Sequence, residues 1–201
     1  TTAYVFYGLA AVIGLFLTAT RGWPVFWIGL VGTAAGIAYT ADPFKYKYRA
    51  LGEISVFLMW GPLMVAGAYF VQRQSISASA VLVSLPFGVL VALVLLANNI
   101  RDVSYDRSKG IFTLPIVLGQ RRGLTLYLAL VVAAYAAVVG MALFGPLSPW
   151  SLIVLLSTPL AVKLLRQMAA DIPLDADAQT ATLDTAFGLL LVISLVLEAL
   201  V

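Results

Sequence analysis

Histidine and cysteine are both absent from this 201-residue chain. Without cysteine, a disulfide framework and a thiolate site are excluded. Without either residue, haem ligation and ordinary zinc sites are not expected, and imidazole cannot act as a general base. Any chemistry must therefore depend on carboxylates, amides, basic side chains and tyrosines.

Charge is also scarce. Only 10% of the residues are charged and 62% are hydrophobic, and the mean hydropathy is +1.02. In soluble domains roughly a quarter of the residues are charged. The composition therefore predicts a polytopic integral membrane protein in contact with the lipid bilayer. The net charge is only +3, and no nucleic-acid partner is expected.

The chain contains seven apolar runs, each close to the roughly 20 residues that span a bilayer as a helix. They are Tyr4–Ala19, Trp23–Tyr39, Ile54–Val71, Ala78–Ala97, Leu124–Phe144, Trp150–Leu165 and Leu183–Val201. The predicted fold is all-α, a transmembrane bundle of seven helices. Small residues allow membrane helices to approach closely, so Gly29, Gly32 and Gly36 could permit a helix contact, but ordinary packing is the favoured interpretation.

Basic residues divide unequally between alternate loops. Ten fall on one side: Lys45, Lys47, Arg49, Arg101, Arg107, Lys109, Arg121, Arg122, Lys163 and Arg166. The other side has only Arg21 and Arg73. The positive-inside rule places the ten in the cytoplasm. Thr1 is then expected on the cytoplasmic side and Val201 on the opposite side.

A polar cluster follows the fourth apolar run. Asp102 and Asp106 are four residues apart, and a continuous helix would place them on one face with Asn98 one turn earlier. Carboxylates with few other protein ligands suit Mg²⁺, which usually shares its shell with water and phosphate oxygens. Nearby bases could meet phosphate charge: Arg101, Arg107 and Lys109. The alternative interpretation is a solvated helix end with i,i+4 charges.

Two other loops carry charged side chains. The segment from Tyr39 to Glu53 mixes bases with tyrosines; alone, its bases could be simple membrane anchors and Glu53 a favourable charge at a helix N-terminus. The segment after the sixth run contains Asp171, Asp175 and Asp177. With its proline and alanines, we interpret it as a flexible connector.

Three stretches of the sequence together resemble one family. They are Asn98-Asn-Ile-Arg-Asp102 with Asp106, Tyr48-Arg-Ala-Leu-Gly-Glu53 after Tyr39, and Ala186-Phe-Gly-Leu-Leu190. The family is the UbiA superfamily of intramembrane prenyltransferases, and the similarity is strongest to its menaquinone-pathway branch, which prenylates 1,4-dihydroxy-2-naphthoate. The first stretch is similar to the second aspartate-rich motif of that superfamily.

The resemblance also shows departures. The family's first aspartate-rich motif, of the Asn-Asp-x-x-Asp kind, is not found in this sequence. The seven runs match helices three to nine of a UbiA-type bundle, so residues 1–201 are expected to form a single prenyltransferase domain that lacks the two N-terminal helices. Ile111 occupies a position that is usually basic in the family, and Lys109 could replace that base.

The resemblance implies Mg²⁺-dependent transfer of a polyprenyl group from a polyprenyl diphosphate to 1,4-dihydroxy-2-naphthoate, with loss of the carboxyl group, giving demethylmenaquinone. Asp102 and Asp106 are the implied metal-binding catalytic residues. The candidates for binding substrate or diphosphate are Asn98, Asn99, Arg101, Lys47, Arg49, Lys109 and Tyr39. The expected location is a prokaryotic cell (inner) membrane, with the active site toward the cytoplasm.

Two other functional classes stay open from the sequence. One is a UbiA-type enzyme of the ubiquinone, haem, chlorophyll or tocopherol pathway, acting on a different aromatic acceptor. The other is a membrane transporter, in which intramembrane acids mark an ion path. The acids of the Asp102 cluster lie at a helix end, and the sequence shows no inverted repeat, which argues against a transporter. A catalytically inert subunit or fragment is a third alternative.

Overall fold

The structure is a computed structural model that describes the backbone of residues 2–200 and the side chains of residues 5–200. The expected positions of Thr1 and Val201 on opposite sides of the membrane concern residues outside that range. Within it, helices dominate, and the only β-type pairing is an isolated bridge between Arg49 and Phe112. The predicted all-α bundle is therefore confirmed.

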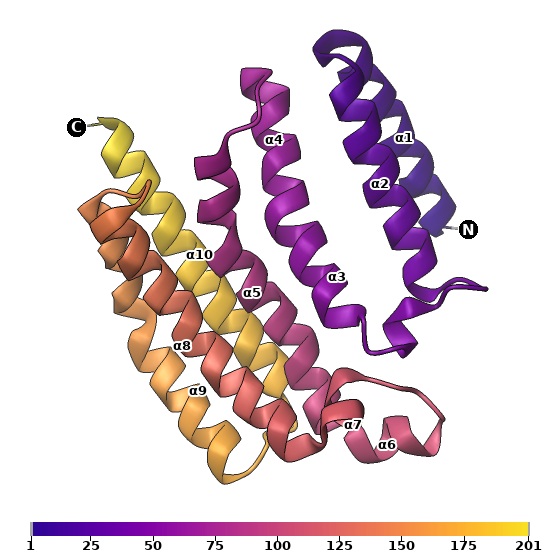
Figure 1. Ribbon diagram of the computed structural model, residues 1–201, viewed down its shortest axis with the longest axis vertical. Coiled ribbons are helices and arrows are strands. Elements are labelled where there is room, and N and C mark those ends of the chain that lie inside the picture. Colours follow the sequence, from indigo (N-terminus) through magenta and orange to yellow (C-terminus); the bar gives the residue numbers. More distant parts are fainter. Residues whose placement is uncertain (1, 201) are drawn as a thin grey trace.

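Seven rods make up the bundle (Figure 1). Five are single helices: α1 (Thr2–Arg21), α2 (Trp23–Thr40), α5 (Ala78–Arg101), α8 (Gln120–Phe144) and α10 (Ala176–Leu200). Two are composite: α3 (Gly52–Leu58) runs through the π-helical turn η2 (Met59–Leu63) into α4 (Met64–Arg73), and the 3₁₀ helix η3 (Pro149–Ser157) runs into α9 (Thr158–Ala170). Three short helices lie in the connections: η1 (Tyr46–Tyr48), α6 (Val103–Ser108) and α7 (Leu114–Leu118).

Six of these rods are long and apolar enough to cross a membrane. They are Trp23–Thr40, Gly52–Arg73, Ala78–Arg101, Gln120–Phe144, Pro149–Ala170 and Ala176–Leu200. The first predicted run is helical too, as α1 (Thr2–Arg21), and the residues with described side chains form an apolar helix over Val5–Arg21. The sequence therefore predicted the rods correctly, and six of the seven predicted runs are candidate membrane spans among the described residues.

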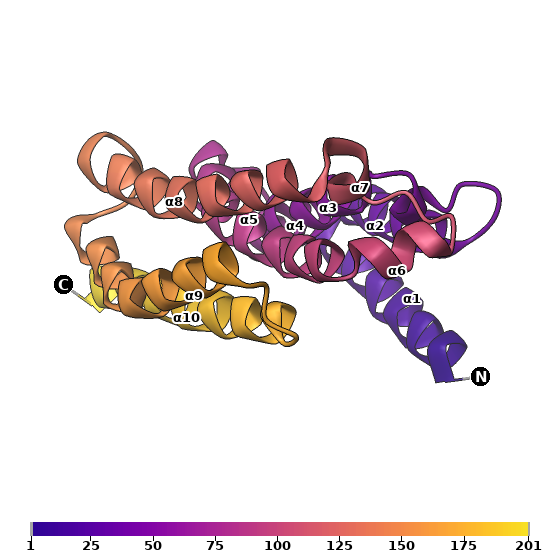
Figure 2. The ribbon, with the colours of Figure 1, turned by 90° about the horizontal axis from the view of Figure 1, so that it is seen from below.

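Helix α5 is the centre of the bundle because α3, η2, α8 and α10 all contact it. Its side chains Leu93, Ala97 and Ile100 are completely buried. On the facing helices, the Tyr127 hydroxyl of α8 lies 2.8 Å from the Thr180 hydroxyl of α10, so a buried polar pair joins them. In the view from below, α9 and α10 form one layer and α5 and α8 lie in the other (Figure 2). The C-terminal end of this central helix carries the Asp102 cluster.

Two glycines allow the third rod to touch α5 directly. A Cβ atom on Gly61 of η2 would lie 2.9 Å from the Cα atom of Gly88, and a Cβ on Gly88 would lie 3.0 Å from the carbonyl oxygen of Phe57. These are backbone atoms, which cannot rotate away as a flexible side chain can. Pro62 lies in the same π-helical turn and lacks a backbone N–H, so it cannot donate a helical hydrogen bond there. The crossing therefore depends on residues without side chains.

Gly29, Gly32 and Gly36 do not form the close helix contact that small residues permit, and they show the ordinary packing favoured from the sequence. A Cβ on Gly29 would have nothing within 4 Å, and a Cβ on Gly32 or Gly36 would meet only side-chain atoms at ordinary distances of 3.7 and 3.5 Å. These glycines lie on α2, which with α1 forms a hairpin set beside the rest of the bundle (Figure 1). A pattern of small residues on one helix does not identify the neighbour that will approach it.

The connections alternate between the two ends of the bundle. The 41–51 loop, α6 with α7, and the connector between α9 and α10 all lie at one end (Figure 1). The α1–α2, α4–α5 and α8–η3 turns lie at the other end. This arrangement agrees with the alternation from which the sides of the membrane were predicted. Most of the bases in the ten-residue group consequently gather at the same end as Asp102 and Asp106.

Because the chain has no cysteine, single cysteines can report this topology directly. Ser108 is the last residue of α6 at one end and Ser75 precedes α5 at the other, and both are exposed. We expect Ser108→Cys to be labelled by a membrane-impermeant thiol reagent from the cytoplasmic side, and Ser75→Cys only from the opposite side. The measurement is labelling in intact cells compared with inverted membrane vesicles. Labelling of both cysteines from one side would contradict the topology.

Candidate functional site

Backbone hydrogen bonds join two loops at the charged end of the bundle. The Ala50 N–H donates to the Phe112 carbonyl oxygen (2.8 Å), and the Phe112 N–H donates to the Tyr48 carbonyl oxygen (3.3 Å). Ala50 has φ of 56°, in the left-handed region that costs a non-glycine residue about 1 kcal/mol or more. The bonds to Phe112 hold it there. They bring the tyrosine- and lysine-rich loop beside the segment that carries the two aspartates.

The helix that carries the aspartates breaks between them. Helix α5 ends at Arg101, Asp102 forms a turn and α6 begins at Val103, whereas the sequence suggested one continuous helix. The helical spacing nevertheless survives, because the Asp102 N–H donates to the Asn98 carbonyl (3.0 Å) and the Asp106 N–H donates to the Asp102 carbonyl (2.9 Å). Asn98, Asp102 and Asp106 thus follow one another at one-turn intervals, as their spacing predicts.

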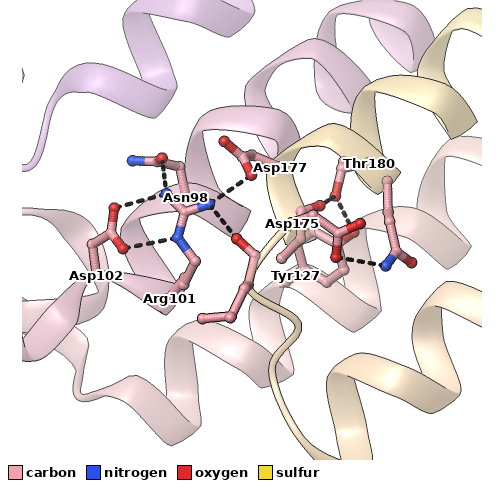
Figure 3. A network of polar contacts seen from close by, with 10 residues as sticks. Asn98, Arg101, Asp102, Tyr127, Asp175, Asp177 and Thr180 are labelled. Carbon is pink, nitrogen blue, oxygen red and sulfur yellow. Dashed lines mark hydrogen bonds and ion pairs between the residues drawn. The ribbon is translucent and has the colours of Figure 1, made fainter.

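Arg101 is the centre of a polar network (Figure 3). Its Nε donates to Asp102 Oδ1 (2.8 Å), and its Nη2 donates to Asp102 Oδ2 (2.9 Å) and to Asn98 Oδ1 (2.6 Å). Its Nη1 donates to Asp177 Oδ1 (2.6 Å) and to the Leu174 carbonyl oxygen (2.9 Å). A guanidinium has five N–H donors, and these five bonds use all of them. Arg101 can therefore contact a diphosphate only by exchanging one of these partners.

The network includes a residue that the sequence interpretation missed. Asp177 lies in the first turn of α10, and its bond to Arg101 ties the α9–α10 connector to the end of α5. The connector that was interpreted as flexible is thus anchored here. The sequence signal was an acid in a connector on the side of the membrane rich in basic residues, but spacing along the chain could not show which base it contacts.

Asp106 is in a different electrostatic situation. Burial, and next to it the negative charge of Asp102, raise the pKa of the Asp106 carboxyl, while the positive charge of Lys47 lowers it. The hydrogen bond from Arg101 holds the pKa of Asp102 below its usual value, although burial opposes this. Among the described residues, the ion pairs join Lys45 to Asp42 and Arg101 to Asp102 and Asp177, so none includes Asp106.

Lys47 brings the other loop to this site. Its ammonium group lies 5.7 Å from the ring centroid of Tyr39 and 5.8 Å from that of Tyr48, within the range of cation–π attraction. Its charge also reaches Asp106. The structure therefore places the Lys47 ammonium over the ring of Tyr39 at the end of α2, in a loop that is bonded to the segment following Asp106.

Asn99 points away from this set, toward α3. Its Nδ2 donates to Glu53 Oε1 (2.8 Å), and both side chains are buried. Adjacent residues of a helix face different directions, so Asn98 accepts from Arg101 whereas Asn99 donates to Glu53. Glu53 lies in the first turn of α3, where the helix dipole favours its charge. Asn99 thus links α5 to the helix that follows the lysine-rich loop.

The two remaining candidates are exposed and engaged nearby. The Nη2 of Arg49 donates to the Pro43 carbonyl oxygen (3.0 Å) within its own loop. The Lys109 ammonium lies 5.7 Å from the ring centroid of Tyr105 on the outside of α6. Among the described residues, no ion pair joins Arg49 or Lys109 to Asp102 or Asp106.

The donor atoms fit a divalent metal that is shared with a substrate. No group of three or more acidic side chains that could hold a metal occurs in residues 5–200. Mg²⁺, however, is commonly held by one or two carboxylates and completes its octahedral shell with water and phosphate oxygens. Asp102 and Asp106 supply two carboxylates, and the crowding of their negative charges favours a bound cation. The pair therefore fits Mg²⁺ as an open half-site.

The chain is similar to known proteins over most of its length. The model of the UbiA prenyltransferase family matches residues 1–195. A 1,4-dihydroxy-2-naphthoate octaprenyltransferase of Bacillus subtilis is 35% identical over 196 residues, covering 96% of this chain and 63% of the relative. One of Escherichia coli with the same name is 32% identical over 136 residues, covering 68% of this chain and 44% of the relative.

The name of a third relative specifies a different transferred group, phytyl. A 2-carboxy-1,4-naphthoquinone phytyltransferase of Synechocystis is 31% identical over 168 residues, covering 81% of this chain and 54% of the relative. The chain thus spans less than two thirds of the length of each of these relatives. The names share a carboxylated naphthalene ring as acceptor and differ in the isoprenoid.

Proposed function

Because the chain belongs to the UbiA prenyltransferase family, we propose that the protein transfers a polyprenyl group from a polyprenyl diphosphate to 1,4-dihydroxy-2-naphthoate. The carboxyl group of the acceptor is lost, and the product has the demethylmenaquinone skeleton. The observation that carries this proposal is the Asp102–Asp106 pair at one end of an apolar helix bundle, in a segment that is hydrogen-bonded to the loop carrying Lys47. The named acceptors of the relatives support the choice of a naphthoate.

The reaction balances without an oxidant. The allylic C–O bond of the donor breaks and its electron pair leaves with the diphosphate. A carbon of the aromatic ring bonds to the allylic carbon, and carbon dioxide departs while the electrons of its C–C bond return to the ring. The negative charge of the lost carboxylate thereby ends on the diphosphate.

The residues of the site have separate parts in this reaction. Asp102 and Asp106 would hold Mg²⁺, which neutralises charge that develops on the leaving diphosphate. The Lys47 ammonium donates hydrogen bonds to a diphosphate oxygen or to the acceptor carboxylate. The ring faces of Tyr39 and Tyr48 favour positive charge on the allylic carbon by cation–π attraction.

The remaining candidates support the geometry from further away. Asn98 and Arg101 orient Asp102 through the bonds described above. Asn99 fixes the start of α3, and Arg49 and the bridge to Phe112 fix the loop that presents Lys47. Lys109, on the exposed side of α6, would meet outer diphosphate oxygens. In each case the side chain acts by position or by charge.

An apolar donor needs an apolar path, and the bundle has two grooves beside the α3–α4 rod. One, of about 780 Å³, lies among α1, α2, η2 and α4. The other, of about 420 Å³, lies among α3, α5, α7 and α8, and Glu53 is its charged lining residue. Such surfaces accommodate an isoprenoid chain and keep water from the allylic cation, which water would quench.

The protein is an integral membrane protein, as its apolar helices and its family show. We place it in a prokaryotic cell membrane, with the site toward the cytoplasm. The support is the excess of basic residues at the end of the bundle that carries Asp102.

The test is an acceptor assay with the purified protein in lipid nanodiscs. A polyprenyl diphosphate is supplied with carboxyl-labelled 1,4-dihydroxy-2-naphthoate or with a monocyclic hydroxybenzoate. We expect Mg²⁺-dependent prenylation of the naphthoate with release of labelled carbon dioxide, and about a hundredfold lower kcat/KM with the hydroxybenzoate. Preference for the monocyclic acceptor, or label retained in the product, would contradict the proposed substrate.

A further inference from the structure

Asp177 holds one edge of the Arg101 guanidinium. Its Oδ1 lies 2.6 Å from Arg101 Nη1, and the Leu174 carbonyl oxygen lies 2.9 Å from the same nitrogen. Asp177 is in the first turn of the 25-residue helix α10, where the helix dipole favours a negative charge. The α9–α10 connector therefore supplies a fixed anionic partner for Arg101.

The opposite edge of the guanidinium holds Asp102. Arg101 Nε and Nη2 take one oxygen each of that carboxylate, at 2.8 and 2.9 Å, in the bidentate geometry that makes strong ion pairs. Figure 3 shows the two aspartates on opposite sides of Arg101. A carboxylate that is shared with a guanidinium has less charge available for a metal ion. The strength with which Arg101 attracts Asp102 therefore depends on how much of the positive charge of Arg101 is balanced by other groups.

We propose that Asp177 is a positioning residue for the cation half-site, which balances the charge of Arg101 so that Asp102 can bind a divalent cation together with Asp106. This inference rests on the proposed function, because it takes Asp102 and Asp106 as the cation ligands. Asp177 acts through Arg101 and does not touch the cation. When Asp102 turns to the cation, Asp177 keeps Arg101 paired.

The variant Asp177→Asn isolates the charge from the contact. The asparagine carbonyl can still accept from Arg101 Nη1, but its negative charge is gone, and Asp102 becomes the single full counter-charge of Arg101. The site also loses one negative charge near the cation. Both changes weaken cation binding, and we expect the dissociation constant for Mn²⁺ to rise about tenfold.

Two single variants control for this effect. Asp177→Glu keeps the charge, so its Mn²⁺ affinity should stay within about threefold of the unaltered protein. Asp175→Asn removes a charge from the same connector, where Asp175 accepts a hydrogen bond from Gln179 (2.9 Å) and does not contact Arg101. Its Mn²⁺ affinity should be unchanged.

The double variant Arg101→Gln/Asp177→Asn separates positioning from simple support of the fold. Removing both charges releases Asp102 and restores the net charge of the site. We expect the Mn²⁺ dissociation constant to return to within about threefold of the unaltered protein, a non-additive result typical of groups in one network. If Asp177 only braced the connector, a second substitution would leave the loss in place or enlarge it.

The measurement is titration of free Mn²⁺ by electron paramagnetic resonance, with the protein in nanodiscs and inorganic pyrophosphate present as the diphosphate probe. Thermal unfolding of each variant monitors folding, and Asp177→Ser replaces Asp177→Asn if the latter does not fold. Unchanged Mn²⁺ binding in the neutral variant, together with its loss in Asp106→Asn, would overturn this inference and leave the proposed function standing. Binding that neither Asp102→Asn nor Asp106→Asn alters would overturn both.

Discussion

Replacement of Asp106 by asparagine is expected to lower kcat for prenyl transfer by about a hundred- to a thousandfold, the size of effect seen when one preorganised electrostatic contact is removed. The Asp106 carboxyl is crowded by the negative charge of Asp102 and makes no ion pair among the described residues. Its charge is therefore available for a cation. Asparagine keeps the size of the side chain and removes that charge, so the loss should fall on the reaction and not on folding.

The experiment compares Asp106→Asn and Asp102→Asn with Asp171→Asn, in which an exposed acid at the same end of the bundle is neutralised. Turnover is measured over a range of Mg²⁺ concentrations, and thermal unfolding is recorded for each variant. The control should retain its activity. Near-normal turnover of both site variants at limiting Mg²⁺ would show that these carboxylates do not hold the metal.

Gly88→Ala is expected to destabilise the bundle by about 1–3 kcal/mol, as overpacking of a tight interface does. The added Cβ would lie 2.9 Å from the Gly61 Cα and 3.0 Å from the Phe57 carbonyl oxygen, so α5 and the α3–η2 segment would have to move apart. In an unconstrained helix the same substitution gains up to about 1 kcal/mol, because alanine has the higher helix propensity. A loss of stability in Gly88→Ala therefore indicates that the two helices touch at this glycine, and a gain indicates that they do not.

Gly140→Ala on α8 is the matched control, because a Cβ at that position would have nothing within 4 Å. It should leave stability unchanged or raise it slightly. Thermal unfolding in a mild detergent measures both variants, and Gly88→Ala should lower the midpoint by several degrees, at roughly 2–4 °C per kcal/mol for a chain of this length. Equal stability of the two variants would mean that the helices do not cross at these glycines.

The sequence by itself determined the features that depend on composition and local spacing. The scarcity of charge and the seven apolar runs predicted an all-α membrane bundle. Apolar side chains are stable in a hydrocarbon layer, and a helix satisfies its own backbone hydrogen bonds there. The i,i+4 spacing placed Asn98, Asp102 and Asp106 at successive helical turns, since hydrogen bonding along one helix depends on near neighbours. The stretches that resemble the UbiA superfamily indicated the family, which the match over residues 1–195 confirms.

Only the tertiary structure decided which of these residues meet. Arg101 and Asp177 are 76 residues apart, Glu53 and Asn99 are 46 apart, and neither pair follows from spacing along the chain. The close approach of Gly61 to Gly88 depends on how two rods cross, and the spacing of glycines along the chain did not indicate it. A guanidinium donates to any carboxylate within reach, and a glycine allows any neighbour to approach closely. Which partner each one contacts is therefore determined by the packing of the whole bundle around α5.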